Sequence, residues 1–158
     1  LGDEEALLAL YRRHAPYVHA LARRILRDGE EAKTVVQDTF LRIWRKAERF
    51  DPTLGTPRTW ILTIAHRLAL NALRRRRVEL PLEDWDAPTE GVGSKGHLEK
   101  IWINQALQAL DREERRLLEL AYFQGYSHSE LAVLLGWPLG TVKSRLRRAL
   151  EKLKAHLG

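Results

Sequence analysis

The spacing of apolar residues divides this chain into two helical zones, separated by one stretch that cannot form a long helix. Apolar side chains recur every three or four residues over 3–77 and again over 97–157, as they do in amphipathic helices. The stretch 79–96 lacks this period and contains two prolines, three glycines, five carboxylates and one lysine. The sequence therefore predicts an all-α fold of two small helical domains, residues 1–78 and 97–158, joined by a flexible acidic linker, residues 79–96.

Proline and glycine positions predict where the helices of the first zone begin and end. The first helical pattern is expected to stop at Pro16, because proline removes an interior hydrogen bond. The second is expected to end at Asp28-Gly29 and the third before the turn-rich segment 50–55. Thr56 is the predicted N-cap of a fourth helix, and Pro57 is its predicted first residue.

The apolar stripes of the third and fourth helices predict the core of this zone. The third stripe contains Ala32, Val35, Val36, Phe40, Ile43, Trp44 and Ala47. The fourth contains Trp60, Ile61, Ile64, Ala65, Leu68 and Ala72. The fourth helix then ends in Arg74–Arg77, which is more positive charge than a helix dipole requires.

Two capping boxes predict helix starts in the second zone. Asp111 with Glu114, and Ser127 with Glu130, have the spacing at which a side chain and a backbone amide cap each other. The first pair is expected to open a helix that buries three residues, Leu117, Leu118 and Ala121. The second is expected to open a helix with Leu131, Leu134 and Leu135 on its apolar side.

The end of the second zone has the pattern of a helix-turn-helix. Gly136 is expected to stop the short capped helix, Trp137-Pro138 to turn the chain, and a basic helix to run from near Thr141 to about Leu157. Such a helix fits the DNA major groove, where arginine pairs with guanine. The alternative is a solvated basic face of no special function. At 100° per residue, the apolar stripe of the last helix contains Val142, Leu146, Ala149, Leu150 and Leu153.

Charge and composition limit the classes of function. A formal net charge of +6 and a pI of about 9.9 favour a polyanionic partner, either nucleic acid or an anionic membrane surface. No apolar run approaches the roughly 20 residues that span a bilayer, and no signal peptide is visible, so we expect a cytoplasmic protein without membrane contact. The chain has no Cys, and its six His follow no metal-site or catalytic spacing. We expect no enzyme activity, no catalytic residue, no metal and no cofactor, and we expect His14 and His19 to lie at the surface.

Two sets of runs carry motifs that occur together in one family. The runs Gly125–Ala132 and Leu135–Ala149 resemble the fourth conserved region of bacterial sigma factors, in particular the extracytoplasmic-function (ECF) group. The runs Val36–Trp44 and Phe50–Pro52, followed by Trp60-Ile61 and Ile64-Ala65, are similar to the second region. The two sets stand in the family's order and cover nearly the whole chain.

The resemblance implies a sigma factor that binds core RNA polymerase, directs it to promoters through their −35 and −10 elements and initiates transcription. It assigns the −35 element to residues 97–158, and the −10 element and the polymerase clamp to residues 1–78. At 100° per residue, the side of the last helix opposite its apolar stripe carries Thr141, Ser144, Arg145 and Arg148, with Lys143 and Arg147 at its margins, and these six are the residues expected at the −35 element. Those implied for the −10 element are Phe50, Asp51, His66, Arg67, Asn71, Arg74 and Arg75. Those implied for the clamp are Thr34, Gln37, Asp38, Leu41, Arg42 and Arg45.

Four positions depart from the family pattern and leave the −10 sequence and the details of clamp contact open. They are Thr34, Pro57, Arg67 and Asn71. The expected partners are core RNA polymerase and promoter DNA, with an anti-sigma factor as a further candidate, and the free protein is expected to be a monomer. By resemblance, the acidic linker would occupy a positively charged nucleic-acid path of the polymerase. Masking of Arg74–Arg77 in the free protein and a plain spacer are the alternatives.

Two other functions remain to be compared with a sigma factor. An ordinary helix-turn-helix regulator would use the first zone for dimerisation or effector binding, and would bind duplex operators without polymerase. An enzyme such as a nuclease is disfavoured, because the sequence has no paired carboxylates and no glycine-rich phosphate loop.

Overall fold

A computed structural model describes residues 4–53, 55–79 and 97–157, and each regular element in these ranges is a helix, as predicted. The chain separates into two compact units, Leu1–Lys100 and Ile101–Gly158. The predicted linker, apart from Glu79 at the end of a helix, lies outside the described residues, as do the predictions made for it. Among the described helices, none has both the length and the apolar character needed to cross a bilayer.

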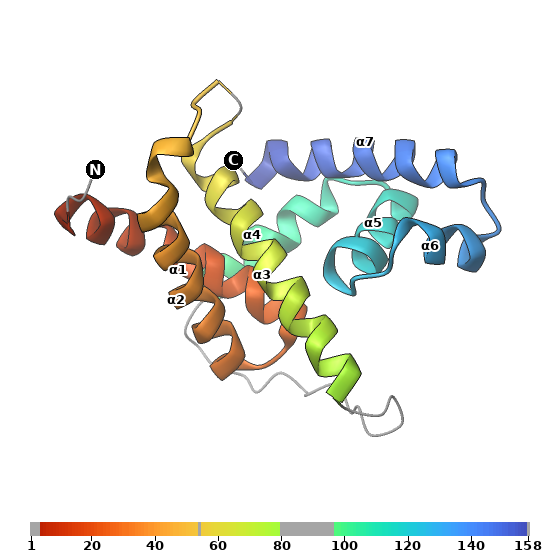
Figure 1. The fold of residues 1–158 in the computed structure, drawn as a ribbon. Coiled ribbons are helices and arrows are strands. Elements are labelled where there is room, and N and C mark those ends of the chain that lie inside the picture. Colours follow the sequence, from red (N-terminus) through yellow and green to blue (C-terminus); the bar gives the residue numbers. More distant parts are fainter. Residues whose placement is uncertain (1–3, 54, 80–96, 158) are drawn as a thin grey trace. The chain divides into compact units, whose positions relative to one another are not determined.

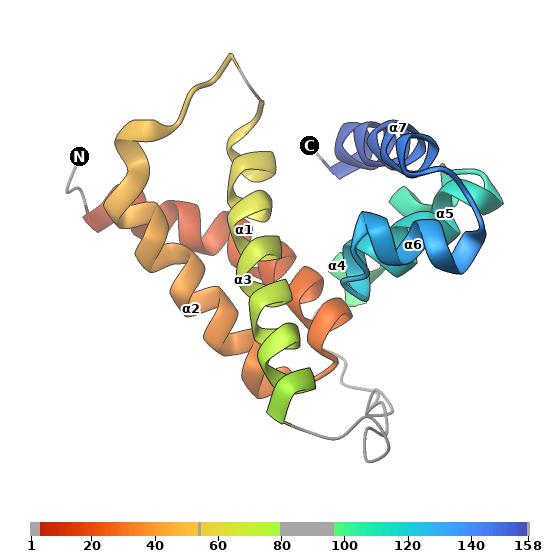
Figure 2. The same cartoon turned by 45° about the vertical axis from the view of Figure 1, so that its right-hand side comes forward.

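Unit 1 is built from three long helices that each pack against the other two (Figures 1 and 2). They are α1 (Glu4–Leu26), α2 (Gly29–Lys46) and α3 (Pro57–Glu79), with a short 3₁₀ turn η1 (Ala47–Arg49) after α2. The segment between η1 and α3 projects from one end of the three helices (Figure 2). The largest fully buried side chains of this unit are Val18, Leu21, Leu26, Thr39, Ile43, Ile61 and Leu73.

Helix α1 continues through Pro16, so the predicted break there is wrong. Proline lacks the amide that would bond to the carbonyl of Arg12, a loss that usually ends or kinks a helix. Pro16 is exposed, however, and so is Arg12, which places the unbonded carbonyl on the exposed side of the helix. Buried residues flank it on both sides, His14 before and Val18 after, and both halves of the helix are therefore held on the same core.

The turn between α1 and α2 is made by a different residue from the one predicted. Gly29 is the first residue of α2 and not the end of the preceding helix. Arg27 takes the left-handed conformation instead, with φ of 55°, and its amide donates to the carbonyl of Arg23 at 2.7 Å. Asp28 is the N-cap of α2, and its carboxylate accepts from the amides of Glu30 and Glu31 at 2.8 and 3.1 Å.

The start of α3 confirms its predicted cap, but its buried stripe is displaced around the helix. The Thr56 hydroxyl accepts from the amide of Thr59 at 3.2 Å, and the helix begins at Pro57. The predicted residues Trp60, Ile64, Leu68 and Ala72 are only half-buried, whereas the fully buried positions are Ile61, Leu62, Ala65, Ala69 and Leu73. Because α1 and α2 both cover α3, periodicity alone does not fix the centre of its stripe.

The predicted stripe of α2 is correct except at its C-terminal end. Trp44 is 40% exposed, and Ala47 is exposed in η1. Both lie beyond the last buried residue of the helix, Ile43, where the neighbouring helices no longer cover α2.

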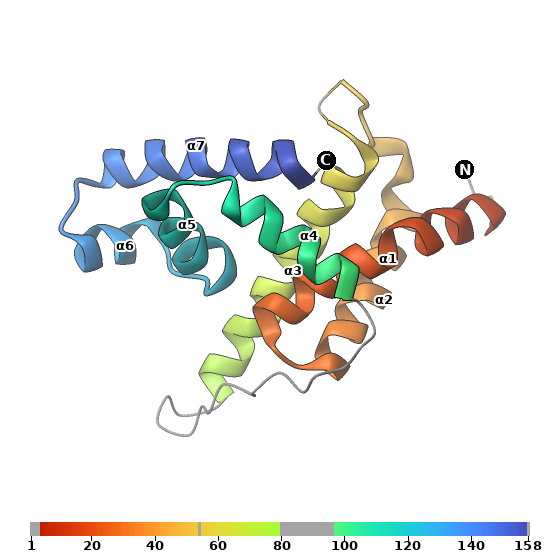
Figure 3. The same cartoon turned by 180° about the vertical axis from the view of Figure 1, so that it is seen from behind.

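Unit 2 contains α4 (His97–Gln108), α5 (Arg112–Leu118), a π-helical segment η3 (Glu119–Phe123), α6 (His128–Leu135) and α7 (Leu139–Leu157), with α4 beginning just before its boundary. Helix α7 lies across α5 and α6 (Figure 3). Buried Leu117, Leu131, Val142 and Leu146 join α5, α6 and α7 in one core cluster.

Both predicted capping boxes are present in unit 2. Asp111 accepts from the amide of Glu114 at 2.7 Å, and Glu114 accepts from the amide of Asp111 at 3.1 Å. Ser127 and Glu130 exchange the same pair of bonds at 3.1 and 3.0 Å. The caps therefore fix the starts of α5 and α6 from local sequence alone.

Two predictions of buried residues in unit 2 are wrong. Phe123 is buried and Ala121 only half-buried, because the wider π turn of η3 changes which residues face the core. Leu134 is 55% exposed on α6, next to Val133 at 86%. Only Leu131 of the short helix α6 is fully buried, against α7 and α5.

Candidate nucleic-acid and polymerase interfaces

The helix-turn-helix of unit 2 is held by backbone bonds at its turn. Gly136 adopts a left-handed conformation with φ of 68°, and the amide of Trp137 donates to the carbonyl of Ala132 at 3.1 Å. A Cβ on Gly136 would meet nothing within 4 Å, so backbone conformation and not space favours glycine here. The carbonyl of Pro138 accepts from the amide of Val142 at 3.2 Å, and α7 begins at Leu139, two residues before the predicted start.

The outward face of α7 carries the residues predicted for the −35 element. Val142, Leu146 and Ala149 of the predicted apolar stripe are buried, as is Leu153. The predicted DNA-facing side chains are exposed, except for half-buried Thr141; they are Lys143, Ser144, Arg145, Arg147 and Arg148. The structure therefore brings all six predicted residues to the part of α7 outside the unit's core.

The cations of this face divide into two groups. Arg145 forms an ion pair with Glu113 of α5, and its guanidinium lies over the Trp137 ring, 4.7 Å from the ring centroid. Lys152 forms an ion pair with Glu114 at 2.8 Å. Lys143, Arg147 and Arg148, by contrast, form no ion pair within the part of the chain that the structure describes. Those three cations are available to DNA phosphates or bases without breaking an internal contact.

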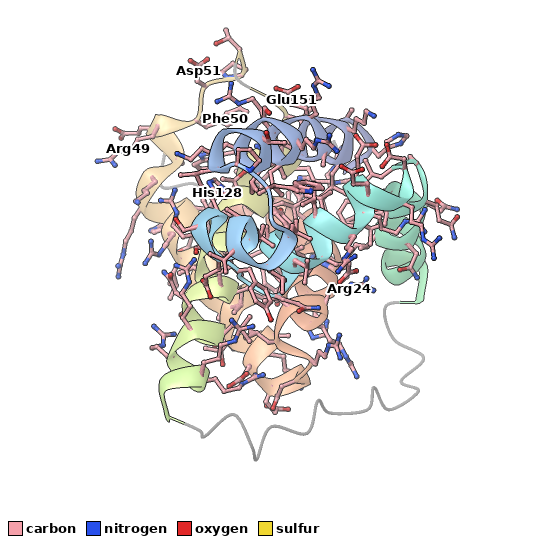
Figure 4. The ribbon with its side chains drawn as sticks, turned by 90° about the vertical axis from the view of Figure 1, so that its right-hand side faces the viewer. Arg24, Arg49, Phe50, Asp51, His128 and Glu151 are labelled. Carbon is pink, nitrogen blue, oxygen red and sulfur yellow. The ribbon has the colours of Figure 1, made fainter. Side chains whose placement is uncertain are left out.

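The loop before α3 places Phe50 and Asp51 at one end of unit 1 (Figure 4). The Phe50 ring packs on Trp60, with ring centroids 5.4 Å apart. Asp51 accepts from the hydroxyl and the amide of Thr53 at 2.6 and 2.9 Å, and these two bonds lower the pKa of the Asp51 carboxyl. Asp51 thus shapes the loop through a local turn.

The other residues predicted for the −10 element lie along α3. Arg67, Asn71 and Arg74 are exposed and share one face, because they are separated by four and three residues. Arg75 is exposed beside them, whereas His66 is half-buried and lies about a quarter turn away from Arg67. The structure brings together four of the five predicted α3 residues.

Trp60 is a residue whose position the sequence did not predict. It was expected in the core, but it is half-buried in the first turns of α3, where it supports Phe50. In the same turns, the Arg58 guanidinium lies 4.0 Å from the centroid of the Tyr17 ring on α1. The signal available in the sequence was the closeness of Trp60 to the loop, where helix ends have fewer packing neighbours.

The six residues predicted for polymerase binding are all exposed on α2. They are Thr34, Gln37, Asp38, Leu41, Arg42 and Arg45. Leu41 is 55% exposed, and Trp44 extends the apolar part of this surface. On α1, Tyr11 is also exposed and packs edge-on against Phe40, with ring centroids 5.0 Å apart. Gln37 is one of the residues that line a groove of about 760 Å³ between α1 and α2.

The histidines give one correction. His14 is buried, at 5% exposure, and is therefore not the surface residue that was expected. Burial, and after it the charges of Arg58 and Arg13, lower its pKa. Because α1 continues past Pro16 as one helix, His14 lies on the same face as buried Val18, four residues further on. Within the described ranges, no group of three or more His, Cys, Asp or Glu side chains is placed to hold a metal ion.

Comparison with known proteins gives consistent matches over both units. Residues 10–79 match the model of sigma-70 region 2, and residues 100–153 match that of sigma-70 region 4. The ECF RNA polymerase sigma factor RpoE of Cereibacter sphaeroides is 34% identical over 160 residues, which cover 98% of this chain and 88% of that protein. The ECF RNA polymerase sigma factor SigK of Mycobacterium sp. (strain KMS) is 32% identical, with 99% and 85% covered.

A solved structure agrees at the level of sequence. Rhodobacter sphaeroides SigE, in complex with the anti-sigma ChrR, is 31% identical and matches 98% of this chain and 90% of its own, with a TM-score of 0.49. The chain belongs to the ECF RNA polymerase sigma factors, which direct RNA polymerase to promoters.

Proposed function

We propose that this sigma factor divides promoter recognition between two domains, residues 97–158 for the −35 element and residues 1–78 for the −10 element. The observation that carries the proposal is the outward face of α7, where Lys143, Arg147 and Arg148 are exposed and have no ion pair in the described chain. Arginine at this position can read guanine, and lysine can neutralise phosphates. The net charge of +6 supports a nucleic-acid partner.

The −10 element is assigned to the loop before α3 and to the exposed face of that helix. Opening a promoter requires a pocket for an unstacked base and a basic surface for a single strand. The Phe50–Trp60 aromatic pair and the Asp51 turn lie next to the first turn of α3, and Arg67, Asn71 and Arg74 follow on one face. The two rings offer a surface on which an unstacked base can stack, and the exposed face of α3 offers a basic surface for a single strand.

Helix α2 is assigned to core RNA polymerase. Its six predicted residues are exposed, and Leu41 at 55% exposure gives the surface an apolar centre among charges. We further propose that the protein acts in the cytoplasm and has no catalytic activity of its own. An anti-sigma factor is the third expected partner, because the 31% identical SigE was solved in complex with one.

The test of the proposal combines the full chain with core RNA polymerase and a library of promoter fragments. The holoenzyme should select fragments with a defined −35 and a defined −10 element. Ser144→Ala and Arg148→Ala should relax the base preference in the −35 element by about 1–3 kcal/mol for each lost contact. Lys143→Ala should instead weaken binding on all sequences and lower the salt slope by about 0.9.

Lys154→Ala is the matched control, since Lys154 is an exposed cation further along α7. It should change neither the base preference nor the salt slope as much as Lys143→Ala does. Equal losses of affinity on every sequence for the Ser144, Arg148 and Lys143 variants would show that these roles are wrongly assigned. Failure of the wild-type holoenzyme to select any element would overturn the proposed division of promoter recognition itself.

A further inference from the structure

Arg145 is an α7 cation that contacts two other parts of unit 2. It was expected to contact DNA, but its guanidinium pairs with Glu113 at the start of α5 and lies over the ring of Trp137 in the turn. The two side chains of the ion pair are each about half exposed, at 48% and 49%. One arginine therefore connects three parts of unit 2: α5, the turn and α7.

A second ion pair attaches the same end of α5 to α7. Glu114, only 13% exposed, pairs with Lys152 at 2.8 Å while it also completes the capping box with Asp111. The next residue, Arg115, donates to the carbonyls of Leu107 and Leu110 at 3.2 and 3.3 Å. The first turn of α5 is thus bonded both to α7 and to the end of α4, which makes it a firm support.

The direction of Arg145 on α7 separates it from the side chains that face outward. Arg145 and Lys152 are seven residues apart, so they lie within about 20° of each other on the flank next to α5. Ser144 lies about 100° away from Arg145 and points away from the buried stripe. An arginine that reads a base has to reach outward with both of its terminal nitrogens. Arg145 instead uses its guanidinium on Glu113 and Trp137.

We propose that Arg145 is a positioning residue, which holds α7 against α5 and the turn through Glu113 and Trp137, and that base discrimination by α7 depends on this three-residue contact. The inference rests on the proposed function. It assigns no DNA base to Arg145, but it makes Arg145 necessary for base reading by the other α7 residues. Such support from residues behind the contacting side chains is what fixes a binding geometry.

Glu113→Gln gives a test with an unambiguous sign. Removing a carboxylate near a DNA-binding face should by charge alone raise the affinity for DNA, because DNA is a polyanion. Glu151→Gln is the matched control: Glu151 is exposed on the outward side of α7 and forms no ion pair in the described chain (Figure 4). The experiment measures the affinity of holoenzymes, made with the full chain and core RNA polymerase, for one promoter and for its −35 variants.

Glu151→Gln should raise the affinity by up to about twofold on all sequences. Glu113→Gln should lower the affinity for the preferred promoter about 3- to 10-fold and reduce discrimination at every position of the −35 element. Arg145→Gln should have the same effect, and the double variant should be no worse than either single variant, because all three break the same contact. Circular dichroism melting of the free chain verifies that these variants remain folded.

Two results would overturn the proposal. One is a loss of preference at a single base pair in Arg145→Gln while Glu113→Gln keeps every preference, which would make Arg145 a base reader. The other is a Glu113→Gln variant that gains affinity as Glu151→Gln does. Trp137→Phe, which keeps an aromatic ring under the guanidinium, should retain most of the discrimination, whereas Trp137→Leu should lose it. Selection of −35 elements by the wild-type holoenzyme tests the proposed function separately.

Discussion

Adjacent arginines of one basic run have different tasks in unit 1. Arg74 and Arg75 are exposed, whereas the Arg76 side chain is only 11% exposed. Arg76 pairs with Glu31 of α2 and donates to the carbonyl of Leu26, the last residue of α1, at 2.7 Å. That carbonyl has no partner within its own helix, so Arg76 supplies one. One side chain of α3 therefore ties the end of α1 to the start of α2.

The first prediction separates stability from DNA binding within this run. Arg76→Ala should lower the free energy of unfolding of unit 1 by about 1–3 kcal/mol, because it removes a charge-assisted hydrogen bond and an ion pair. Arg75→Ala, the matched control, should change it by less than about 0.5 kcal/mol. Denaturant titrations give both values. In promoter-opening assays with folded protein, Arg75→Ala should instead lower activity more than Arg76→Ala does. Equal destabilisation by the two variants would contradict this assignment.

The second prediction concerns pH and His14. Its pKa is lowered in the folded protein from the ordinary value of 6.5, by burial and by the charges of Arg58 and Arg13. The unfolded chain therefore binds a proton more readily than the folded one. The contribution of neutral His14 to the free energy of unfolding is therefore complete above about pH 6.5. It is lost as the pH falls through the lower pKa that His14 has in the folded protein.

Hydrogen-exchange protection of buried α1 amides, corrected for the intrinsic rate, should accordingly fall between about pH 7.5 and about pH 5.5. His14→Gln should reduce this fall, because it removes the titrating group. His128→Gln is the control, since His128 is exposed at the start of α6 (Figure 4). An undiminished pH dependence in His14→Gln would assign the effect to other groups.

At the scale of helices, the sequence predicted the features that depend on residues close together in the chain. The capping boxes at Asp111 and Ser127, the stop at Gly136 and the cap at Thr56 involve residues three or four positions apart, and all four are present. The outward faces of α2 and α7 followed in the same way, because they lie opposite the apolar stripes. Local chemistry was sufficient for these features.

Contacts between residues that are far apart in the sequence were not predicted. The carbonyl of Leu26 meets Arg76 from 50 residues away, and Glu114 meets Lys152 across 38 residues. Neither pairing has a periodic signature in the sequence. The same holds for the stripe of α3, whose position is set by the two helices that cover it, and for the ion pair between Arg145 and Glu113. The apolar pattern of one helix does not indicate which other helices pack against it.

The third prediction concerns Pro16 inside α1. Pro16→Ala should stabilise unit 1 by about 1–2 kcal/mol, since alanine restores the amide bond to the carbonyl of Arg12 and Pro16 is exposed, so no core packing is lost. Denaturant titration measures the change. Thr63→Ala, an exposed change on another helix, shows the effect of alanine itself. Unchanged stability in Pro16→Ala would show that α1 has already adapted to its proline.

At the scale of the whole molecule, each unit has its own buried core, and each would contribute one DNA contact. Two weak contacts on separate units act together only when a scaffold fixes their spacing, and core RNA polymerase would be that scaffold. This view differs from an ordinary helix-turn-helix regulator, in which a dimer supplies the second contact.

The fourth prediction follows from this difference. The free full-length protein should sediment as a monomer, and it should bind promoter fragments at least about tenfold more weakly than its holoenzyme does in gel-shift assays. A tight dimer with nanomolar affinity for a duplex operator, in the absence of polymerase, would favour the regulator instead. Neither outcome depends on the roles of single α7 residues.

The division of the α7 cations has a consequence for how promoter preference evolves. Arg145 and Lys152 form ion pairs with α5, whereas Lys143, Arg147 and Arg148 form none with the residues that the structure describes. After a gene duplication, the codons of these three residues and of Ser144 can therefore drift without loosening the helix that presents them. If Lys143, Ser144, Arg147 and Arg148 contact DNA as proposed, selection for a new promoter can act on them separately from selection for stability at Arg145 and Lys152. A new regulon can then arise through few substitutions, each leaving a folded protein.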